Sequence, residues 1–175
     1  MKDKSIVINL DDIKNETAEL KKIMLMYNSA LKEIETKVNI LSDEFQTLYR
    51  YNPIEHIKTR VKSPESIMKK MEKKGLGLTY NNMINYINDI AGIRIICSFL
   101  PDIYRIVEMF EKSDDLKILE KKDYIEKPKQ SGYSSYHLIV LVPVSFSNGT
   151  VDVKVEIQIR TIAMDFWASL EHKIK

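Results

Sequence analysis

The stretch VDVKVEIQIRT, residues 151–161, alternates apolar and polar side chains along its length. Val or Ile stands at every odd position from 151 to 159, and each even position carries a charged or amide side chain. Successive side chains of a β-strand point to opposite faces, so the apolar set predicts a strand with one face against a core. The other face presents Glu156, Gln158 and Arg160, and it is either solvated or part of a ligand site.

The segments around this strand predict an α+β fold. Hydrophobic runs rich in β-branched residues indicate three more strands, within residues 89–99, 116–125 and 136–146. Asn148-Gly149 joins the last of these to the quoted strand as a hairpin. Helices are expected from Pro101 to Lys112 and from Thr161 onward. We therefore expect a mixed β-sheet of four to five strands flanked by helices.

A long N-terminal helix is predicted, because apolar residues across positions 20–48 recur at alternating steps of four and three. They are Leu20, Met24, Tyr27, Leu31, Ile34, Val38, Leu41, Phe45 and Leu48. The helix either lies on its own domain or forms an oligomer contact. We expect Asn9, Asp11 or Asp12 to cap its start and Asn52-Pro53 to end it.

Length, charge and cysteine content limit the classes of protein to which the chain can belong. A chain of 175 residues suits a single globular unit, with residues 1–50 as an N-terminal helical segment and 51–175 as the main domain. The net charge of +2 does not by itself indicate a nucleic-acid or membrane partner. The single Cys97 agrees with a reducing compartment, and no apolar run or signal peptide directs the chain to a membrane. A cytoplasmic location is expected.

A second predicted helix is strongly basic. Ser63-Pro64 opens it and Gly75 follows its end. Between residues 58 and 74, seven basic side chains stand against Glu65 and Glu72; they are Lys58, Arg60, Lys62, Lys69, Lys70, Lys73 and Lys74. The run is either a solvated face or the wall of an anion site.

Several common motifs are absent. The one GxG, at residues 75–77, does not follow a predicted strand, and no P-loop occurs. His56, His137 and His172 are too scattered to predict a zinc site, and no nucleophile-elbow motif marks a catalytic triad. Rossmann, P-loop, zinc and hydrolase-triad chemistry therefore have no support.

Two carboxylates are candidates for a magnesium site. Glu156 lies on the polar face of the quoted strand and Asp89 at the head of another, and Mg²⁺ prefers a few carboxylate oxygens with water and phosphate. The alternative is that both are solvated. Arg94 is five residues from Asp89, so the two share a site only if Asp89 precedes the strand or Gly92 bends it.

The loop KPKQSGYSSYH, residues 127–137, is a candidate nucleotide contact. Tyr133 follows Gly132, which lets the backbone approach a ligand closely. An exposed tyrosine beside lysines and a histidine suits a stacked base with nearby phosphates. The alternative is a polar loop that enters a strand.

Four motifs occur in order along the chain: RVK (60–62) with Ser66-Ile67, DIAGIRI (89–95), SGYSSYH (131–137) and VEIQIRT (155–161). Their order and spacing resemble the synthetase domain of RelA/SpoT-type alarmone enzymes, above all the small alarmone synthetases, in which that domain stands alone. The resemblance runs from about residue 53 to 172. It implies a nucleotidyltransferase-like synthetase fold, with residues 51–175 as the catalytic domain.

The resemblance implies a pyrophosphokinase that moves the β,γ-pyrophosphate of ATP onto the 3′-hydroxyl of GDP, GTP or GMP, giving ppGpp, pppGpp or pGpp and AMP. Asp89 and Glu156 would hold Mg²⁺, and Glu156 would help to deprotonate the hydroxyl. Arg60 and Arg94 would sandwich the adenine of ATP. The phosphates of ATP would meet Lys62 and Lys70.

The same resemblance places the acceptor nucleotide. Tyr133 would stack on guanine, with Lys129 and His137 near the acceptor phosphates and Gln158 supporting the cleft. Asp165 could accept from N1–H and the 2-amino group of guanine, or it is merely a first-turn helix residue. On the quoted strand, Asp152 and Lys154 lie nearer the hairpin and are expected to be solvated.

Some features differ from the family pattern. Ser134 stands where relatives often carry Arg or Lys, which leaves the preferred acceptor open. The family's hydrolase domain and its later helices are not in the chain, so we expect no product hydrolysis and a homo-oligomer whose state, a tetramer in relatives, is open. Single-stranded RNA has no support in the sequence. The competing functions are a non-catalytic nucleotide- or RNA-binding regulator and a nucleotidyltransferase that releases pyrophosphate.

Overall fold

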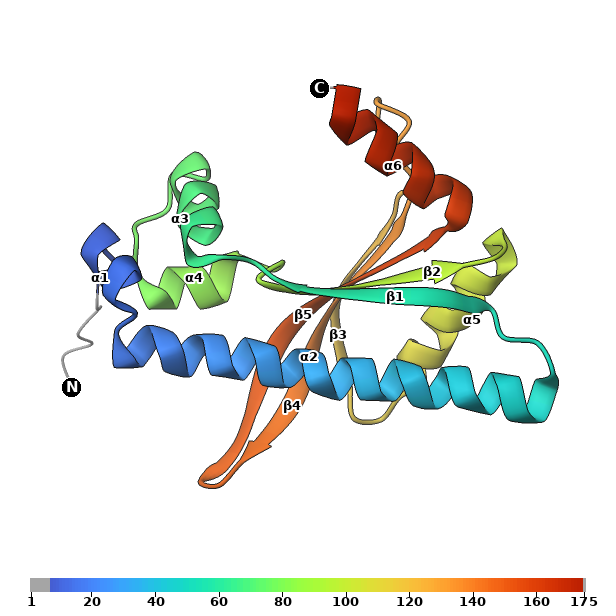
Figure 1. Ribbon diagram of the computed structural model, residues 1–175, viewed down its shortest axis with the longest axis horizontal. Helices are drawn as coiled ribbons and strands as arrows, with labels where there is room; N and C mark the ends of the chain where they lie inside the picture. Colours follow the sequence, from blue (N-terminus) through green and yellow to red (C-terminus); the bar gives the residue numbers. More distant parts are fainter. Residues whose placement is uncertain (1–6, 175) are drawn as a thin grey trace.

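A five-stranded mixed sheet forms the centre of the structure, a computed structural model that describes residues 7–174 (Figure 1). The strands are β1 (Ile54–Val61), β2 (Ala91–Cys97), β3 (Lys117–Asp123), β4 (Tyr136–Phe146) and β5 (Gly149–Thr161). They lie in the order β1-β2-β5-β4-β3; β2 and β5 are parallel, and the other neighbours are antiparallel. The predicted fold class is confirmed.

Strand β5 has the predicted two faces. Its apolar residues from Val153 to Ile159 are buried in the hydrophobic core. The predicted hairpin is present, but its loop is residues 147 and 148, one position before the expected Asn148-Gly149, because Gly149 already pairs with Phe146. The expected solvation of Lys154 is wrong: it is half-buried, and its Nζ donates to the Asn85 carbonyl oxygen at 2.7 Å. The last turn of α4 and Asn88 after it contact this part of β5, and local alternation does not reveal that contact.

The long N-terminal helix is α2 (Ala18–Glu44), which continues as the π-helical turn η1 (Phe45–Tyr49). Its buried residues are Leu20, Ile23, Tyr27, Ala30, Leu31, Ile34 and Val38, and they share one core with the sheet. The helix thus lies on its own domain. The predicted cap was wrong, because a separate helix α1 (Leu10–Asn15) precedes it. Thr17 Oγ1 accepts from the Leu20 N–H at 3.3 Å instead.

Strand β1 and helix α4 (Tyr80–Tyr86) were not predicted from the sequence. As the edge strand of the sheet, β1 buries only Ile54 and otherwise carries polar or partly exposed side chains, so its alternation is weak. Helix α4 is one short, polar element that buries Tyr80 and Met83. Both elements depend on neighbours that are distant in sequence.

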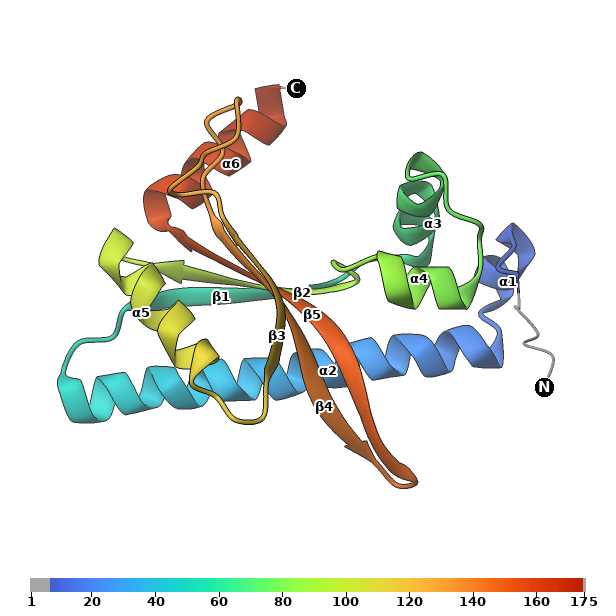
Figure 2. The same ribbon diagram turned by 180° about the vertical axis from the view of Figure 1, so that it is seen from behind.

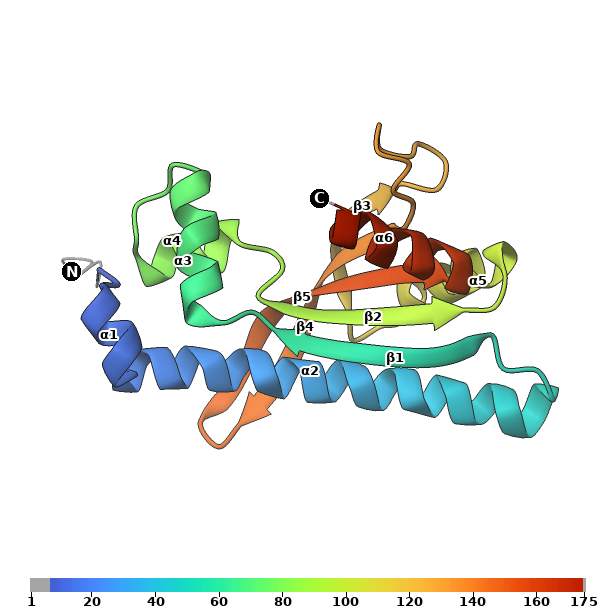
Figure 3. The same cartoon turned by 45° about the horizontal axis from the view of Figure 1, so that its top comes forward.

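The remaining helices are α3 (Pro64–Lys73), α5 (Leu100–Glu111) and α6 (Ile162–Ile174). Helices α1, α3 and α4 gather near one end of α2, whereas α5 lies near the other (Figure 2). Helix α6 lies across the sheet from α2 (Figure 3), and so it covers the polar side of β5. Within residues 7–174 there is no helix long and apolar enough to cross a membrane.

Candidate active site

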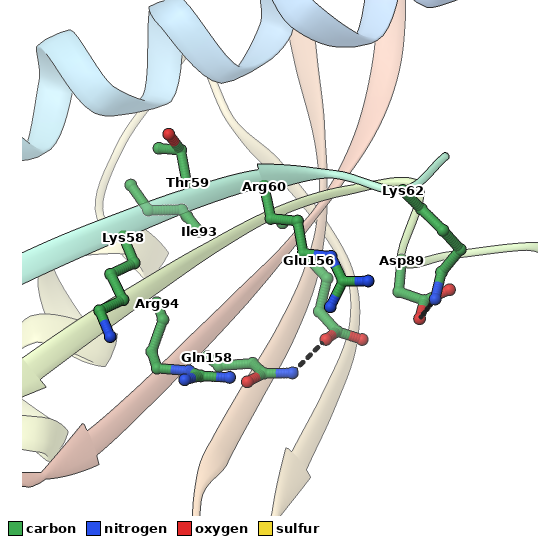
Figure 4. Close-up of a pocket in the computed structure, with 10 residues that line it drawn as sticks. Lys58, Thr59, Arg60, Lys62, Asp89, Ile93, Arg94, Glu156 and Gln158 are labelled. Atoms are coloured by element: carbon green, nitrogen blue, oxygen red, sulfur yellow. Dashed lines mark hydrogen bonds and ion pairs between the residues drawn. The ribbon is translucent and has the colours of Figure 1, made fainter. Parts of the chain in front are cut away.

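A cavity of about 380 Å³ opens over strands β1, β2 and β5 (Figure 4). It is lined by Lys58, Thr59, Arg60, Lys62, Asp89, Gly92, Ile93, Arg94, Glu156 and Gln158. We call it the carboxylate cavity, because Asp89 and Glu156 both line it. Three elements that are far apart in the sequence therefore bring predicted metal, ATP and acceptor residues to one place.

Asp89 precedes β2, which begins at Ala91, and this is one of the two conditions under which it shares a site with Arg94. Its carboxylate is ion-paired with Lys70 Nζ at 2.7 Å and with Lys62 Nζ at 3.2 Å. Burial alone would raise the pKa of Asp89, but Lys70 and then Lys62 outweigh burial and lower it below its ordinary value. The group is thus an ionised carboxylate between two cations.

Glu156 lies opposite Gly92 in the parallel pairing of β5 with β2. Because glycine has no side chain, the space beside the Glu156 carboxylate stays open to the cavity. Gln158, two residues further on the same face, donates from Nε2 to Glu156 Oε1 at 2.6 Å (Figure 4). The carboxylate is therefore held in place by its own strand.

A second cavity, of about 470 Å³, adjoins the first through Arg60 and Arg94, which line both. Its other lining residues are Tyr133, Arg160, Ala168, Ser169, Glu171 and His172. We call it the arginine cavity. Arg94 and Arg160 each donate to Asp165 Oδ1 at 3.2 Å. Burial and then the charge of Arg160 lower the pKa of Arg94, while Asp165 opposes both effects.

Tyr133 is the centre of a polar and aromatic group beside the arginine cavity. Its hydroxyl lies 2.9 Å from His137 Nε2, and Lys129 Nζ lies 5.1 Å from its ring centroid. Burial, followed by the charges of Arg160 and Lys129, lowers the pKa of His137 to about 4. His137 is therefore a neutral imidazole at neutral pH in this arrangement.

The sequence does not predict two aromatic residues that lie beside the 127–137 loop. The Tyr124 ring packs edge-on to the Tyr133 ring at 6.2 Å, and it also lies 4.8 Å from Lys129 Nζ. At Gly132, where φ is +84°, the group that approaches closely is the indole of Trp167 on α6. Neither residue belongs to a quoted motif, and no periodic signal places either one beside the loop.

The acidic side chains of the site determine whether it can hold a metal ion. Among the described residues, no cluster of three or more His, Cys, Asp and Glu side chains could hold one. Asp89 and Glu156 nevertheless offer carboxylate oxygens to one cavity, and Mg²⁺ typically uses one or two carboxylates and completes its shell with water and phosphate. The donor set fits a hard divalent cation that is bound together with a phosphorylated ligand.

Two carboxylates, three arginines and a tyrosine gathered over one side of a mixed sheet define a protein that binds phosphorylated nucleotides. The family described as "Region found in RelA / SpoT proteins" matches residues 59–175. The chain belongs to this RelA/SpoT family.

Individual relatives agree with the family match. The GTP pyrophosphokinase YwaC of Bacillus subtilis is 51% identical over 168 residues, which cover 96% of this chain and 80% of that protein. The crystal structure of small alarmone synthetase 1 from Bacillus subtilis bound to its product pppGpp has a TM-score of 0.83 at 36% identity, covering 90% of this chain and 81% of that one. The same enzyme bound to AMPCPP has a TM-score of 0.76 at 32% identity, covering 90% and 78%.

Proposed function

We propose that the chain is a guanosine 3′-pyrophosphokinase, a (p)ppGpp synthetase. The observation that carries this proposal is the meeting of both candidate carboxylates with Arg60, Lys62 and Arg94 in one cavity. The similarity to a GTP pyrophosphokinase, over most of both chains, supports it.

The reaction transfers two phosphoryl groups in one step. The 3′-oxygen of GDP, GTP or GMP forms a bond to the β-phosphorus of ATP, and the bond from that phosphorus to the oxygen bridging it to the α-phosphorus breaks. AMP leaves with that oxygen. The proton of the 3′-hydroxyl passes toward Glu156, and general-base help of this kind contributes about 10²- to 10⁴-fold.

On the ATP side, Arg60 and Arg94 lie on neighbouring strands and line both cavities. Planar guanidinium groups stack on a base while they remain charged, which suits both arginines to the two sides of adenine. Lys62 and Lys70, which pair with Asp89, are the cations available to the ATP phosphates. Repulsion between the two nucleotides requires such a basic wall.

On the acceptor side, Tyr133 provides a ring on which guanine stacks, and Lys129 beside it serves the acceptor phosphates. His137, behind the Tyr133 hydroxyl, orients the ring, and Gln158 orients Glu156. Asp165, at the start of α6, is the candidate acceptor of hydrogen bonds from N1–H and the 2-amino group of guanine. If Asp165→Ala leaves the preference for guanine over adenine acceptors unchanged, this contact does not exist.

Asp89 and Glu156 would hold Mg²⁺. When bound, the ion would neutralise charge that develops on the transferring phosphates. The contribution of the chain is to hold both carboxylates at one cavity, with Asp89 ionised beside Lys62 and Lys70. This arrangement is supported by the lowered pKa of Asp89 and by the Gln158 contact to Glu156.

We further propose that the chain acts in the cytoplasm as a homo-oligomer, with a tetramer as the candidate state. Helix α6 has no buried residue, and it exposes Phe166, Leu170 and Ile174. Apolar side chains in that number on one short helix favour a protein contact. Light scattering after size-exclusion chromatography tests this, and a monomer at micromolar concentration would contradict it.

The activity is tested by incubating the protein with Mg²⁺, ATP and each of GMP, GDP and GTP, with products identified by mass. We expect AMP together with a guanosine nucleotide that has gained two phosphates. Pyrophosphate in place of AMP would indicate nucleotidyl transfer. Nucleotide binding without any product would indicate a non-catalytic regulator.

A further inference from the structure

Arg160 is a buried cation at the centre of the site, and the roles proposed above do not use its charge. Its side chain is 4% exposed. Removing a guanidinium from water costs several kcal/mol, which its partners must offset. An apolar side chain would fill the same space without that cost. The contacts of Arg160 therefore indicate what its charge and shape provide.

Three groups receive hydrogen bonds from the Arg160 guanidinium. Nη2 donates to the Tyr133 hydroxyl oxygen at 2.8 Å and to Gln158 Oε1 at 2.9 Å. Nη1 donates to Asp165 Oδ1 at 3.2 Å. Because the guanidinium is a rigid planar fork, these partners are held in a fixed relation to one another.

The contact to Gln158 sets the orientation of the catalytic carboxylate. Since Gln158 Oε1 accepts from Arg160, its amide nitrogen faces Glu156 and donates to Oε1 at 2.6 Å. The reversed amide would set donor against donor at Arg160 and acceptor against acceptor at Glu156. Arg160 thereby fixes which group Gln158 offers to Glu156.

The contact to Tyr133 sets the orientation of the base platform. Arg160 donates to the phenol oxygen, and its Cζ lies 5.2 Å from the ring centroid. The phenol proton is then available to His137 Nε2 at 2.9 Å. Burial keeps the pKa of His137 near 4, so its imidazole is neutral and can accept this proton. The Tyr133 ring is therefore held through its hydroxyl from two sides.

We propose that Arg160 is a positioning residue that holds Tyr133 and, through Gln158, Glu156 in one arrangement. The guanine platform and the carboxylate that meets the 3′-hydroxyl are then set relative to each other by a single side chain. This inference rests on the proposed function, and it adds that acceptor recognition and catalysis share one polar network.

Three substitutions separate the two branches of this network. Tyr133→Phe breaks only the branch to the base platform, and its main effect should be an acceptor KM raised about tenfold. Gln158→Leu breaks only the branch to Glu156, and it should lower kcat about tenfold with a small change in acceptor KM. Arg160→Met, of similar volume but uncharged, should produce both effects. Adding Tyr133→Phe to Arg160→Met should then raise acceptor KM little further.

The conservative variant and two independent readouts make the inference falsifiable. Arg160→Lys keeps a charge for Asp165 but loses the fork, so kcat and acceptor KM should stay impaired; full recovery of both would overturn the proposal. Arg160→Met with a lowered Tm but unchanged kcat and KM would reduce Arg160 to a structural role. Arg105→Met, an exposed arginine on α5, is the matched control.

Calorimetric binding of GDP tests the base branch without turnover, and Arg160→Met should weaken it about tenfold. Unchanged GDP affinity would overturn that branch. A wild-type chain that binds GDP through this network but releases no AMP would contradict the proposed function and leave the base branch supported.

Discussion

The two faces of β5 arise from one alternating pattern but depend on different parts of the molecule. On one face, the apolar residues from Val153 to Ile159 are buried against the core that includes α2. On the other, Glu156, Gln158 and Arg160 acquire their geometry from β2, the 127–137 loop and α6. Burial alone accounts for the apolar face, whereas the polar face forms a site only together with residues that are distant in sequence. Substitutions on the two faces should therefore affect different measurements.

The largest expected effect is on the polar face. Glu156→Gln removes the group that we propose accepts the hydroxyl proton, so kcat should fall by about 10²- to 10⁴-fold while ATP affinity stays near the wild-type value. AMP release measured by chromatography, with ATP binding by calorimetry, tests this. Asp152→Asn is the matched control, because Asp152 lies on the same face of β5 but is exposed. An equal loss of kcat in both variants would contradict the division of this face into a catalytic part at Glu156 and a solvated part at Asp152.

The apolar face should affect stability instead. Ile157 is 0% exposed, so Ile157→Ala should lower the free energy of unfolding by about 2–5 kcal/mol. The KM values of the folded protein should stay near those of the wild type. Urea denaturation and steady-state kinetics measure the two quantities, and Val151→Ala, at the exposed end of the strand, should change stability little. A kinetic defect without a stability defect in Ile157→Ala would contradict the division between faces.

An intermediate effect is expected at Tyr133, which the polar face reaches through Arg160. Tyr133→Ala removes the stacking platform, whose contribution is about 1–3 kcal/mol. Acceptor KM should rise about 5- to 150-fold at saturating ATP, with ATP KM little changed. Tyr86→Ala, an exposed tyrosine on α4, provides the control. If the KM for ATP rises more than the KM for the acceptor, Tyr133 contacts ATP and not the acceptor nucleotide.

The smallest effect near neutral pH is the pH dependence of stability due to His137. Its pKa falls from 6.5 to about 4 on folding, so the unfolded chain binds a proton that the folded chain does not. Stability should therefore decrease as pH falls from about 6.5 to about 4. His137→Gln should remove this decrease in stability, whereas His56→Gln, at an exposed position, should leave it unchanged. The loss due to Asp89, whose pKa is lowered, should begin only below about 3.8.

Alternation and β-branched runs predict β2, β4 and β5, whose apolar residues are buried in a local pattern. The short apolar run at its start predicts β3, although this edge strand has no buried residue. No such run marks β1, which carries Arg60 to the cavity, because this edge strand consists mostly of polar and charged residues. Family motifs predict the candidate site residues individually. Which of them touch, such as Asp165 between Arg94 and Arg160 or Tyr124 against Tyr133, depends on long-range packing that no local pattern contains.

The central claim is that the polar face of β5 transfers the β,γ-pyrophosphate of ATP to a guanosine 3′-oxygen. Its most direct test uses ATP labelled at either the γ- or the α-phosphate, with Mg²⁺ and GDP. We expect the γ label to enter the guanosine product and the α label to remain in AMP, and Glu156→Gln should slow the formation of both labelled products by about 10²- to 10⁴-fold. An α label in the guanosine product, or a γ label released as pyrophosphate, would contradict it.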